Sequence, residues 1–318
     1  MAQNLTLASG VYDLTVPLID GLVKIDGYDL NVLSEFQTVD DIFRRMLSNA
    51  EFDACELSLS SYTVSRDQGD DRFIAIPVFC NRHFVFKNIM TRSDSGIKSP
   101  QDLAGRSLCG TEYQNTRWVW ARGIIDELYG VKPSQIKWVT EKPERVPINL
   151  PPEIKTEKLP PGMTTLQALE NGTVDAAFSF FKPKEGNIVC LFDNSKQEDI
   201  GYYQKTGMFP AMHTVVIKRE LVDRDPSLPT KLMAAYQRAK ELSLARRQTF
   251  IRQGGSSLIW LNEATREQSR LIGEDPFAYG LKANEKWLNK FLSYLVSEGL
   301  ISNKPELSSM FASSLLET

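Results

Sequence analysis

The sequence predicts an α/β protein of two lobes with a helical C-terminal third. Short apolar segments alternate with segments of helical periodicity as far as residue 218. The chain has 318 residues. A single hydrophobic core rarely serves more than roughly 250–300 residues, so two lobes are expected. From Pro229 onward, the apolar positions recur mainly at helical spacing.

The composition is that of a globular chain rather than a fibrous, disordered or membrane protein. Hydrophobic residues make up 42% and charged residues 24% of the sequence, with a net charge of −3. The apolar run at residues 73–79 is far shorter than the ~20 residues of a membrane helix. We therefore expect neither a nucleic-acid nor a membrane partner. The N-terminal residues lack the charged and apolar regions of a signal peptide, so we expect a cytoplasmic location.

Histidines are scarce in the chain, and the common cofactor-binding motifs are absent from it. The chain has only 2 histidines, His83 and His213, and no H-E-x-x-H motif. It also lacks the glycine-rich loops of dinucleotide and nucleotide sites and the G-x-S-x-G turn of hydrolases. We therefore expect neither a cofactor nor a metal. No C-x-x-C pair occurs, and we expect buried, reduced thiols at Cys55, Cys80, Cys109 and Cys190.

The first part of the chain alternates short strands with an amphipathic helix. Thr38 and Asp41 have the spacing of a capping box, and apolar residues follow from Ile42 to Leu47 at helical intervals. We expect this helix, residues 38–50, to pack one face on a sheet. Apolar content and flanking turn residues predict the strands of that sheet at residues 5–8, 28–33, 52–57 and 73–79.

The same alternation recurs in the middle of the chain. A turn and short helix at residues 98–106 open a second lobe, and a helical stripe runs from Trp118 to Leu128 before Gly130. The proline-rich residues 143–161 predict an extended crossing segment or a surface loop. The predicted lobes are residues 1–90 with 214–318, and residues 91–213. A short helix is expected at 164–171, strands at 107–111, 136–139, 174–181, 188–192 and 213–218, and C-terminal helices near 230–252, 262–272 and 283–298.

Polar residues gather directly after predicted strands, where open α/β sheets bind ligands. Ser60 and Ser61 follow the third strand, and Asn115, Thr116 and Arg117 begin the helix of the second lobe. The N–H groups at that helix end, together with Arg117, predict a carboxylate site. Ordinary helix capping is the alternative for the four uncharged residues.

The sequence around each of the two histidines leaves two interpretations open. Asn81-Arg82-His83 follows the apolar run at residues 73–79 and is either an anion-binding group or a surface turn. His213 precedes a predicted strand in a mostly apolar context, so it either faces a cleft or is a core histidine. A histidine has a reference pKa of about 6.5, which suits proton transfer near neutral pH.

Six stretches carry a resemblance to a known family. They lie in order at residues 51–63, 73–79, 110–131, 144–154, 207–221 and 273–288, and the third reads GTEYQNTRWVWARGIIDELYGV. Together they resemble the 4,5-dihydroxyphthalate decarboxylase family. The resemblance implies a fold like that of type II periplasmic solute-binding proteins, with two α/β lobes, two crossing strands and a ligand cleft between the lobes. It also implies an enzyme of aromatic-compound catabolism, of the kind used in phthalate degradation.

Two stretches depart from the family pattern. After Arg82 the family usually carries Phe-Arg-His, where this chain has Phe84-Val85-Phe86. Near the end of the strand that begins at Val174 the family usually has an arginine, where this chain has Phe180-Phe181-Lys182. Both changes remove polar groups from expected cleft positions. A less charged or more apolar aromatic acid would suit these residues better than dihydroxyphthalate.

The resemblance and the polar clusters lead to one main hypothesis, decarboxylation of a hydroxylated aromatic carboxylic acid without a cofactor. His213 or His83 would be the general acid that protonates the ring carbon, and Glu112 is a candidate base. Arg82 and Arg117 would anchor carboxylate groups. Hydroxyl-orienting, substrate-binding or ring-packing roles are expected for Ser60, Ser61, Tyr113, Asn115, Thr116, Phe180 and Phe181.

Two alternatives use the same residues. One is a non-catalytic binding protein for an aromatic acid, of the solute-receptor type, and the expected lack of a signal peptide argues against it. The other is a different lyase, such as a dehydratase, that also works by proton transfer. In the first two hypotheses the ligand is a small aromatic carboxylate. A homo-oligomer is compatible with the sequence.

Overall fold

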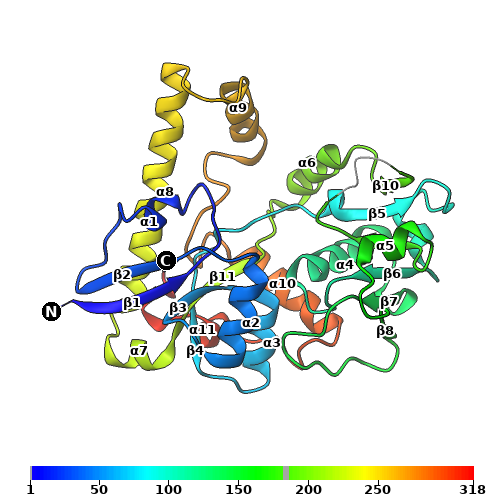
Figure 1. Ribbon diagram of the computed structural model, residues 1–318, viewed down its shortest axis with the longest axis horizontal. Coiled ribbons are helices and arrows are strands. Elements are labelled where there is room, and N and C mark those ends of the chain that lie inside the picture. The colour runs from blue at the N-terminus through cyan, green and yellow to red at the C-terminus, as the bar shows by residue number, and fades with distance from the viewer. Residues whose placement is uncertain (1, 182–185) are drawn as a thin grey trace. The chain divides into compact units, whose positions relative to one another are not determined.

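A computed structural model describes residues 2–181 and 186–318 of the chain. The chain divides into two compact units, each built from one sheet and several helices (Figure 1). Unit 1 comprises Met1–Arg82, Ala211–Lys286 and Pro305–Thr318, and unit 2 comprises His83–Pro210 and Trp287–Lys304. The predicted α/β fold class is therefore confirmed.

Unit 1 is built on a five-stranded sheet with the order β2-β1-β3-β11-β4. Strand β1 is parallel to β2 and β3, whereas β11 is antiparallel to both β3 and β4. This register places His213, the first residue of β11, opposite Ser58 at the carboxyl end of β3. The strands are β1 (Gln3–Ala8), β2 (Tyr28–Leu33), β3 (Ala54–Ser58), β4 (Phe73–Ile76) and β11 (His213–Lys218).

The predicted amphipathic helix of unit 1 is confirmed as α2 (Val39–Asn49). Its capping box joins Thr38 and Asp41, and its buried face includes Phe43. Elsewhere in unit 1, Leu7, Val215 and Tyr236 belong to one buried cluster, which ties the sheet to α8. The other helices of the unit are α1 (Val16–Ile19), α3 (Leu59–Asp67), α7 (Arg219–Arg224), α8 (Leu228–Gln253), α9 (Leu261–Ile272), α11 (Leu307–Met310) and the short η4 (Ser313–Leu315).

Unit 2 is built on a six-stranded sheet with the order β10-β5-β9-β6-β7-β8. Strands β9, β6, β7 and β8 pair in parallel, and β5 is antiparallel to β9 and β10. Strand β6 ends at Gly110, and helix α4 (Thr116–Tyr129) begins after a short connection at the carboxyl end of this strand. The strands are β5 (Ile89–Arg92), β6 (Ser107–Gly110), β7 (Lys137–Thr140), β8 (Thr156–Lys158), β9 (Ala176–Phe178) and β10 (Ile188–Cys190).

The C-terminal helix α10 (Glu285–Ser297) contributes its main apolar face to unit 2. The ring of Trp120 in α4 lies 5.2 Å from that of Phe291 and 6.4 Å from that of Trp287. Just beyond the helix, Glu298 accepts a 2.8 Å hydrogen bond from Nε of Arg122, and both side chains are buried. The other helices are α4 (Thr116–Tyr129), α5 (Thr165–Glu170), α6 (Ser195–Thr206), η1 (Phe86–Asn88), η2 (Pro100–Leu103) and η3 (Pro133–Gln135).

The two units differ from the sequence-derived lobes at three places. Residues 83–90 lie in unit 2, residues 211–213 lie in unit 1, and residues 287–304 lie in unit 2. The last difference follows from the aromatic packing on Trp120 and from the buried pair of Arg122 with Glu298. The sequence analysis placed residues 287–304 in the first lobe because they follow its other C-terminal helices. Position along the chain does not reveal these contacts with unit 2.

Some elements carry little sequence signal. Helix α6 buries only Tyr202, and all three residues of β8 are exposed within the proline-rich stretch. Neither segment shows the apolar pattern that identifies a core-facing element. Within the described part of the chain, no helix combines the length and the hydropathy that crossing a bilayer requires.

Candidate functional site

His213 is held by a buried carboxylate in unit 1. Its Nδ1 lies 2.6 Å from Oε1 of Glu56, and only 12% of its side chain is exposed. The ring of Phe43 packs edge-on against the imidazole, with the centroids 4.8 Å apart. Because an ionised carboxylate only accepts hydrogen bonds, Nδ1 carries the hydrogen and Nε2 is the nitrogen that can exchange a proton.

Glu56 is fully buried in β3 and accepts further hydrogen bonds. The Tyr12 hydroxyl donates to it at 2.6 Å and the Gly10 backbone N–H at 2.9 Å. Burial opposes ionisation, but the charge of His213 and the hydrogen bonds from His213, Tyr12 and Gly10 outweigh it and lower the pKa of Glu56. Nδ2 of Asn81 donates to Oη of Tyr12 at 3.0 Å, which extends the network.

The absence of a side chain at position 10 permits this network. A Cβ built on Gly10 would lie 2.7 Å from Oη of Tyr12 and 2.9 Å from the Val39 side chain. Any larger residue would push Tyr12 away from Glu56. Gly10 thus leaves room for the Tyr12 ring beside the backbone N–H that donates to Glu56.

Three other candidate residues of unit 1, Arg82, Ser60 and Ser61, are buried inside the unit. The buried Arg82 donates to the Ala278 carbonyl at 3.2 Å and to the Asn284 side chain. Ser60 and Ser61 are fully buried in the first turn of α3. The Ser61 N–H donates to Oγ of Ser58, the N-cap of that helix, at 3.4 Å.

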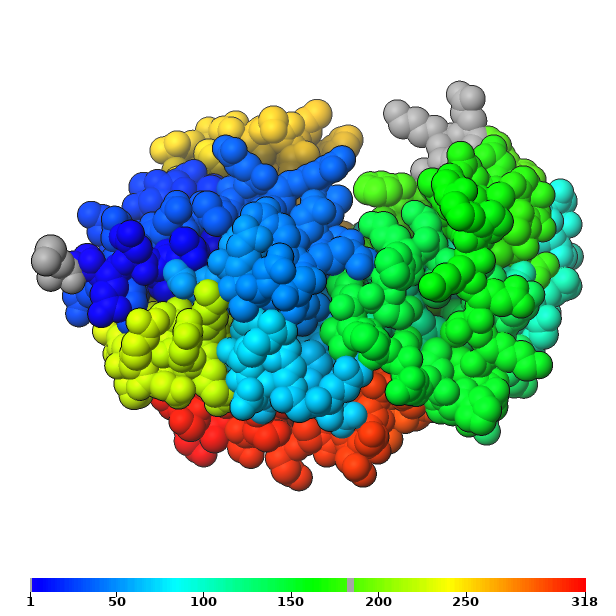
Figure 2. Space-filling view, turned by 60° about the horizontal axis from the view of Figure 1, so that its bottom comes forward, coloured from blue at the N-terminus to red at the C-terminus, as the bar shows by residue number. Residues whose placement is uncertain are grey.

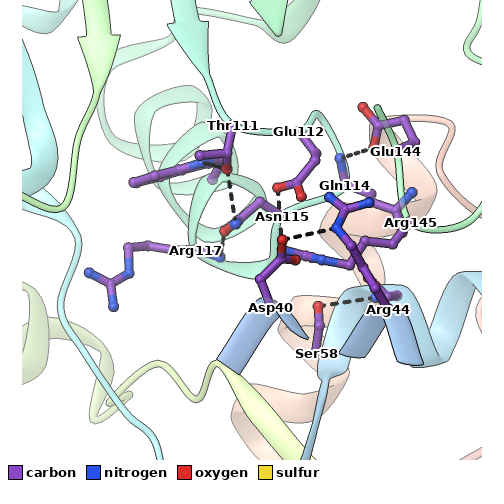
Figure 3. Close-up of polar contacts among 12 residues, drawn as sticks. Asp40, Arg44, Ser58, Thr111, Glu112, Gln114, Asn115, Arg117, Glu144 and Arg145 are labelled. Atoms are coloured by element: carbon purple, nitrogen blue, oxygen red, sulfur yellow. Dashed lines mark hydrogen bonds and ion pairs between the residues drawn. The ribbon is translucent and has the colours of Figure 1, made fainter. Parts of the chain in front are cut away.

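In unit 2, the start of α4 carries the polar group predicted for carboxylate binding (Figure 3). Asn115 is the N-cap, and its Oδ1 accepts from the Arg117 N–H at 3.1 Å. Its Nδ2 donates to Oγ1 of Thr111 at 3.3 Å, and Trp118 Nε1 donates to the same oxygen at 3.1 Å. Capping therefore accounts for Asn115. Thr116 is buried as the first residue of the helix.

Arg117 is partly exposed beside aromatic rings. Its Nη1 donates to Oδ1 of Asn88 at 3.3 Å, and its Cζ lies 4.7 Å from the ring centroid of Phe180. Phe180 in turn packs on Trp118, with the centroids 5.0 Å apart. Unit 2 therefore has a positive charge, that of Arg117, directly beside an apolar surface formed by Phe180 and Trp118. Phe181 is 78% exposed, and Lys182 lies outside the described residues.

Glu112 and Tyr113 lie inside unit 2. Glu112 is buried and pairs with Arg145 at 3.2 Å (Figure 3). The guanidinium carbon of Arg122 lies 3.8 Å from the Tyr113 ring centroid, and burial raises the pKa of that tyrosine. Both side chains thus contact charged groups within the unit.

His83, the other histidine, begins unit 2 and is half-buried. Its backbone N–H donates to the Pro210 carbonyl at 3.0 Å, which pairs the two chain segments at this boundary of unit 2. The next residue, Phe84, packs on Phe209 with the ring centroids 4.7 Å apart. The aromatic departure from the family pattern therefore lies directly beside His83.

The structure brings together some of the predicted residues and adds others. Arg117, Asn115, Thr116 and Phe180 gather at the start of α4, whereas His213 meets Glu56, which the sequence analysis did not select. The only signal for Glu56 was a carboxylate in the interior of the mainly apolar strand predicted at residues 52–57. No group of three or more His, Cys, Asp or Glu side chains among the described residues is arranged to hold a metal. The remaining additions are Tyr12 and Asn88.

Comparison with solved structures identifies the fold. The periplasmic aliphatic sulphonate binding protein SsuA of Escherichia coli aligns with a TM-score of 0.56 and 12% identity, over 98% of this chain and 92% of that one. A sulfonate-binding SsuA from Methylobacillus flagellatus gives 0.56 and 16%, over 98% and 91%. These likenesses confirm the two-lobe fold of periplasmic binding proteins.

Comparison with curated proteins identifies the family. No family model matches the chain. A 4,5-dihydroxyphthalate decarboxylase of Comamonas testosteroni is 34% identical over 326 residues, which cover 99% of this chain and 98% of that protein. A second, from Pseudomonas putida, is 39% identical over 179 residues, covering 54% and 69%. The chain belongs to the 4,5-dihydroxyphthalate decarboxylase family, a family of carboxy-lyases.

Proposed function

We propose that this chain decarboxylates a hydroxylated aromatic carboxylic acid, either 4,5-dihydroxyphthalate or a less charged relative, without a cofactor. The observation that carries the proposal is the buried pair of His213 and Glu56 in a member of this family. A histidine oriented through Nδ1 by a carboxylate presents Nε2 as a proton donor.

The reaction replaces a carboxylate by a hydrogen on the ring. The bond between the ring carbon and the carboxylate carbon breaks, and carbon dioxide leaves. The electron pair of that bond stays on the ring carbon, which takes a proton from Nε2 of His213. Solvent then returns a proton to the imidazole. Glu56 keeps its negative charge throughout and stabilises the protonated ring of His213.

We assign carboxylate binding to Arg117 in unit 2. A guanidinium binds a carboxylate through two parallel hydrogen bonds, and the N–H groups at the start of α4 favour an anion nearby. Phe180 and Trp118 beside Arg117 offer an apolar surface to an aromatic ring. The phenylalanine in place of the family's arginine is the reason to include less charged acids as substrates.

His83 is the alternative proton donor. Single substitutions of the two histidines distinguish these candidates. We would incubate the wild type, His213→Gln and His83→Gln with 4,5-dihydroxyphthalate and a panel of hydroxybenzoates, and follow carbon dioxide and product by mass spectrometry. Loss of turnover only in His213→Gln supports the assignment. Full activity in both variants would overturn it.

The competing function is that of a non-catalytic aromatic-acid receptor. The likeness to proteins named as sulphonate-binding proteins favours this candidate. A receptor would be stabilised against heat by its ligand in proportion to occupancy, with no product formed. Thermal stabilisation by an acid of the panel without any carbon dioxide release would replace the decarboxylase proposal by this one.

A further inference from the structure

A helical arm extends from unit 1. We define the arm as residues 241–272, the second half of α8 together with α9. The last buried residue of α8 is Lys240, and α9 buries none of its residues. A helix of 26 residues is about 39 Å long, and beyond Lys240 it contacts the rest of unit 1 mainly through Arg247, which pairs with Asp13 at 2.8 Å, and Leu242, which packs on the core. Figure 1 shows this half reaching beyond the sheet of unit 1, with α9 beside it.

The tip of the arm exposes large apolar side chains. Phe250, Leu258, Ile259 and Trp260 are between 43% and 83% exposed. Gly254 ends α8 in the left-handed conformation, and the Leu261 N–H donates to the Leu258 carbonyl at 3.2 Å, so the turn has a defined geometry. In Figure 2 the yellow and gold atoms of this part of the chain lie at the surface. Apolar groups clustered on a surface usually mark an interaction site.

One face of α9 carries a regular pattern of charge. Glu263, Arg266, Glu267 and Arg270 occupy positions i, i+3, i+4 and i+7, and all four are exposed. They therefore form one stripe along the helix, in which the signs alternate from one residue to the next. A groove of about 370 Å³ is lined by Leu261, Ala264, Thr265 and Gln268 of α9, by residues of α8, and by Asp13, Leu14 and residues 274–277.

The charged stripe is complementary to itself when reversed. If two copies of α9 lie antiparallel about the midpoint between Arg266 and Glu267, Glu263 of one copy lies opposite Arg270 of the other. Arg266 then lies opposite Glu267, so every charge in the stripe meets its opposite. A parallel arrangement in register would oppose each charge to an identical one, which is unfavourable.

We propose that the arm is the interface of a homodimer, in which two copies of α9 pair antiparallel about a twofold axis. Such an axis makes the same patch serve both copies, and this requires a self-complementary surface. The same register brings Trp260 to the C-terminal turn of the other copy's α9, where Leu271 and Ile272 are half-buried. The dimer would therefore cover exposed apolar groups as well as match charges.

Charge reversal tests the pairing on the full chain. The variant Glu263→Arg/Glu267→Arg makes the stripe wholly positive, and Arg266→Glu/Arg270→Glu makes it wholly negative. We expect the wild type to sediment as a dimer, and each variant to have a dimer Kd about 100-fold higher because like charges then meet. An equimolar mixture of the two variants should form a heterodimer with a Kd close to that of the wild type.

Matched controls separate this outcome from general effects of charge. Glu153→Arg/Glu170→Arg changes two exposed carboxylates of unit 2 by the same amount and should sediment like the wild type. Circular dichroism of every variant checks the fold. A monomeric wild type, or a dimer that persists unchanged in both stripe variants, overturns the proposal. Binding of a monomeric wild type to anionic phosphatidylserine vesicles would assign the apolar tip to a membrane surface instead.

Discussion

Glu56 and His213 lie 157 residues apart in the sequence, yet their side chains meet at 2.6 Å on neighbouring antiparallel strands of unit 1. The carboxylate is fully buried, and the imidazole is the only part of the pair with exposed surface. A buried acid stays ionised only where a neighbouring charge and hydrogen bonds offset its burial, and here the charge of His213 and the hydrogen bonds from His213, Tyr12 and Gly10 do so. This arrangement orients one nitrogen of a histidine and leaves the other for chemistry.

The first prediction concerns the proton donor. His213→Gln should lower kcat for carbon dioxide release by about 10²–10⁴-fold, the usual contribution of a general acid. The glutamine amide can still donate to Glu56, so the fold should survive. Single-turnover kinetics with mass-spectrometric detection of product measures the effect, and His83→Gln is the matched variant. An unchanged kcat in His213→Gln would assign the proton transfer to another group.

The second prediction concerns Glu56 as a positioning residue. Its pKa is lowered in the folded state, so its contribution to stability is full above the unfolded value near 4.5 and is lost as the pH falls below that value. In Glu56→Gln, which cannot titrate there, the free energy of unfolding should fall less between pH 7 and about pH 4 than in the wild type. Urea unfolding at the two pH values measures it.

A catalytic readout separates positioning from stability alone. The glutamine amide cannot stabilise a charged imidazole as a carboxylate does, so the pH dependence of kcat should shift in Glu56→Gln. Glu153→Gln, at an exposed position, is the control and should leave both the pH dependence of unfolding and that of kcat as in the wild type. Identical pH profiles for Glu56→Gln and the wild type would reduce Glu56 to a structural role.

The sequence predicted the parts of this arrangement unequally. The strands at 28–33 and 213–218 are confirmed at both ends, because apolar residues and flanking turns mark them clearly. His213 stood out because histidine is rare in the chain. Glu56 was not selected. An apolar strand pattern predicts that a position is buried, but it does not predict which side chain of another strand will contact that position. Only the pairing of β3 with β11 brings that partner into contact.

In unit 2 the sequence predicted the location better than the contacts. The start of α4 was found from its capping residues and its arginine, and the structure confirms Asn115 as the cap. Asn88, which accepts from Arg117, precedes β5 and carries no local signal. Glu112 was selected as a base from its type, whereas its burial beside Arg145 depends on a contact across 33 residues.

The third prediction concerns Arg117. Arg117→Ala should raise KM for an aromatic carboxylate by about 10–100-fold, the loss of a hydrogen bond to a charged group. Arg117→Lys keeps the charge but loses the bidentate fork, so its KM should be intermediate. Steady-state kinetics measures both. Arg106→Ala removes an exposed arginine of unit 2 that lies 3.7 Å from Asp175, and its KM should stay at the wild-type value. Equal KM values in all four proteins would contradict the assignment.

The last prediction concerns the buried pair that fixes the C-terminal segment to unit 2. Arg122 donates to Glu298 at 2.8 Å through Nε and to the Tyr113 carbonyl at 2.7 Å, with both charged side chains at most 2% exposed. Removing one partner leaves a buried charge uncompensated, so Glu298→Ala should lower the free energy of unfolding by about 3–5 kcal/mol. Arg122→Met/Glu298→Met buries no charge and should cost less than Glu298→Ala. Urea unfolding measures both.

The exposed pair Lys137–Glu157 is the control, since Glu157→Ala should cost less than about 1 kcal/mol. If the double variant were less stable than Glu298→Ala, the loss of stability in Glu298→Ala would not come from the unpaired buried charge of Arg122. The attraction between Arg122 and Glu298 would then itself stabilise unit 2.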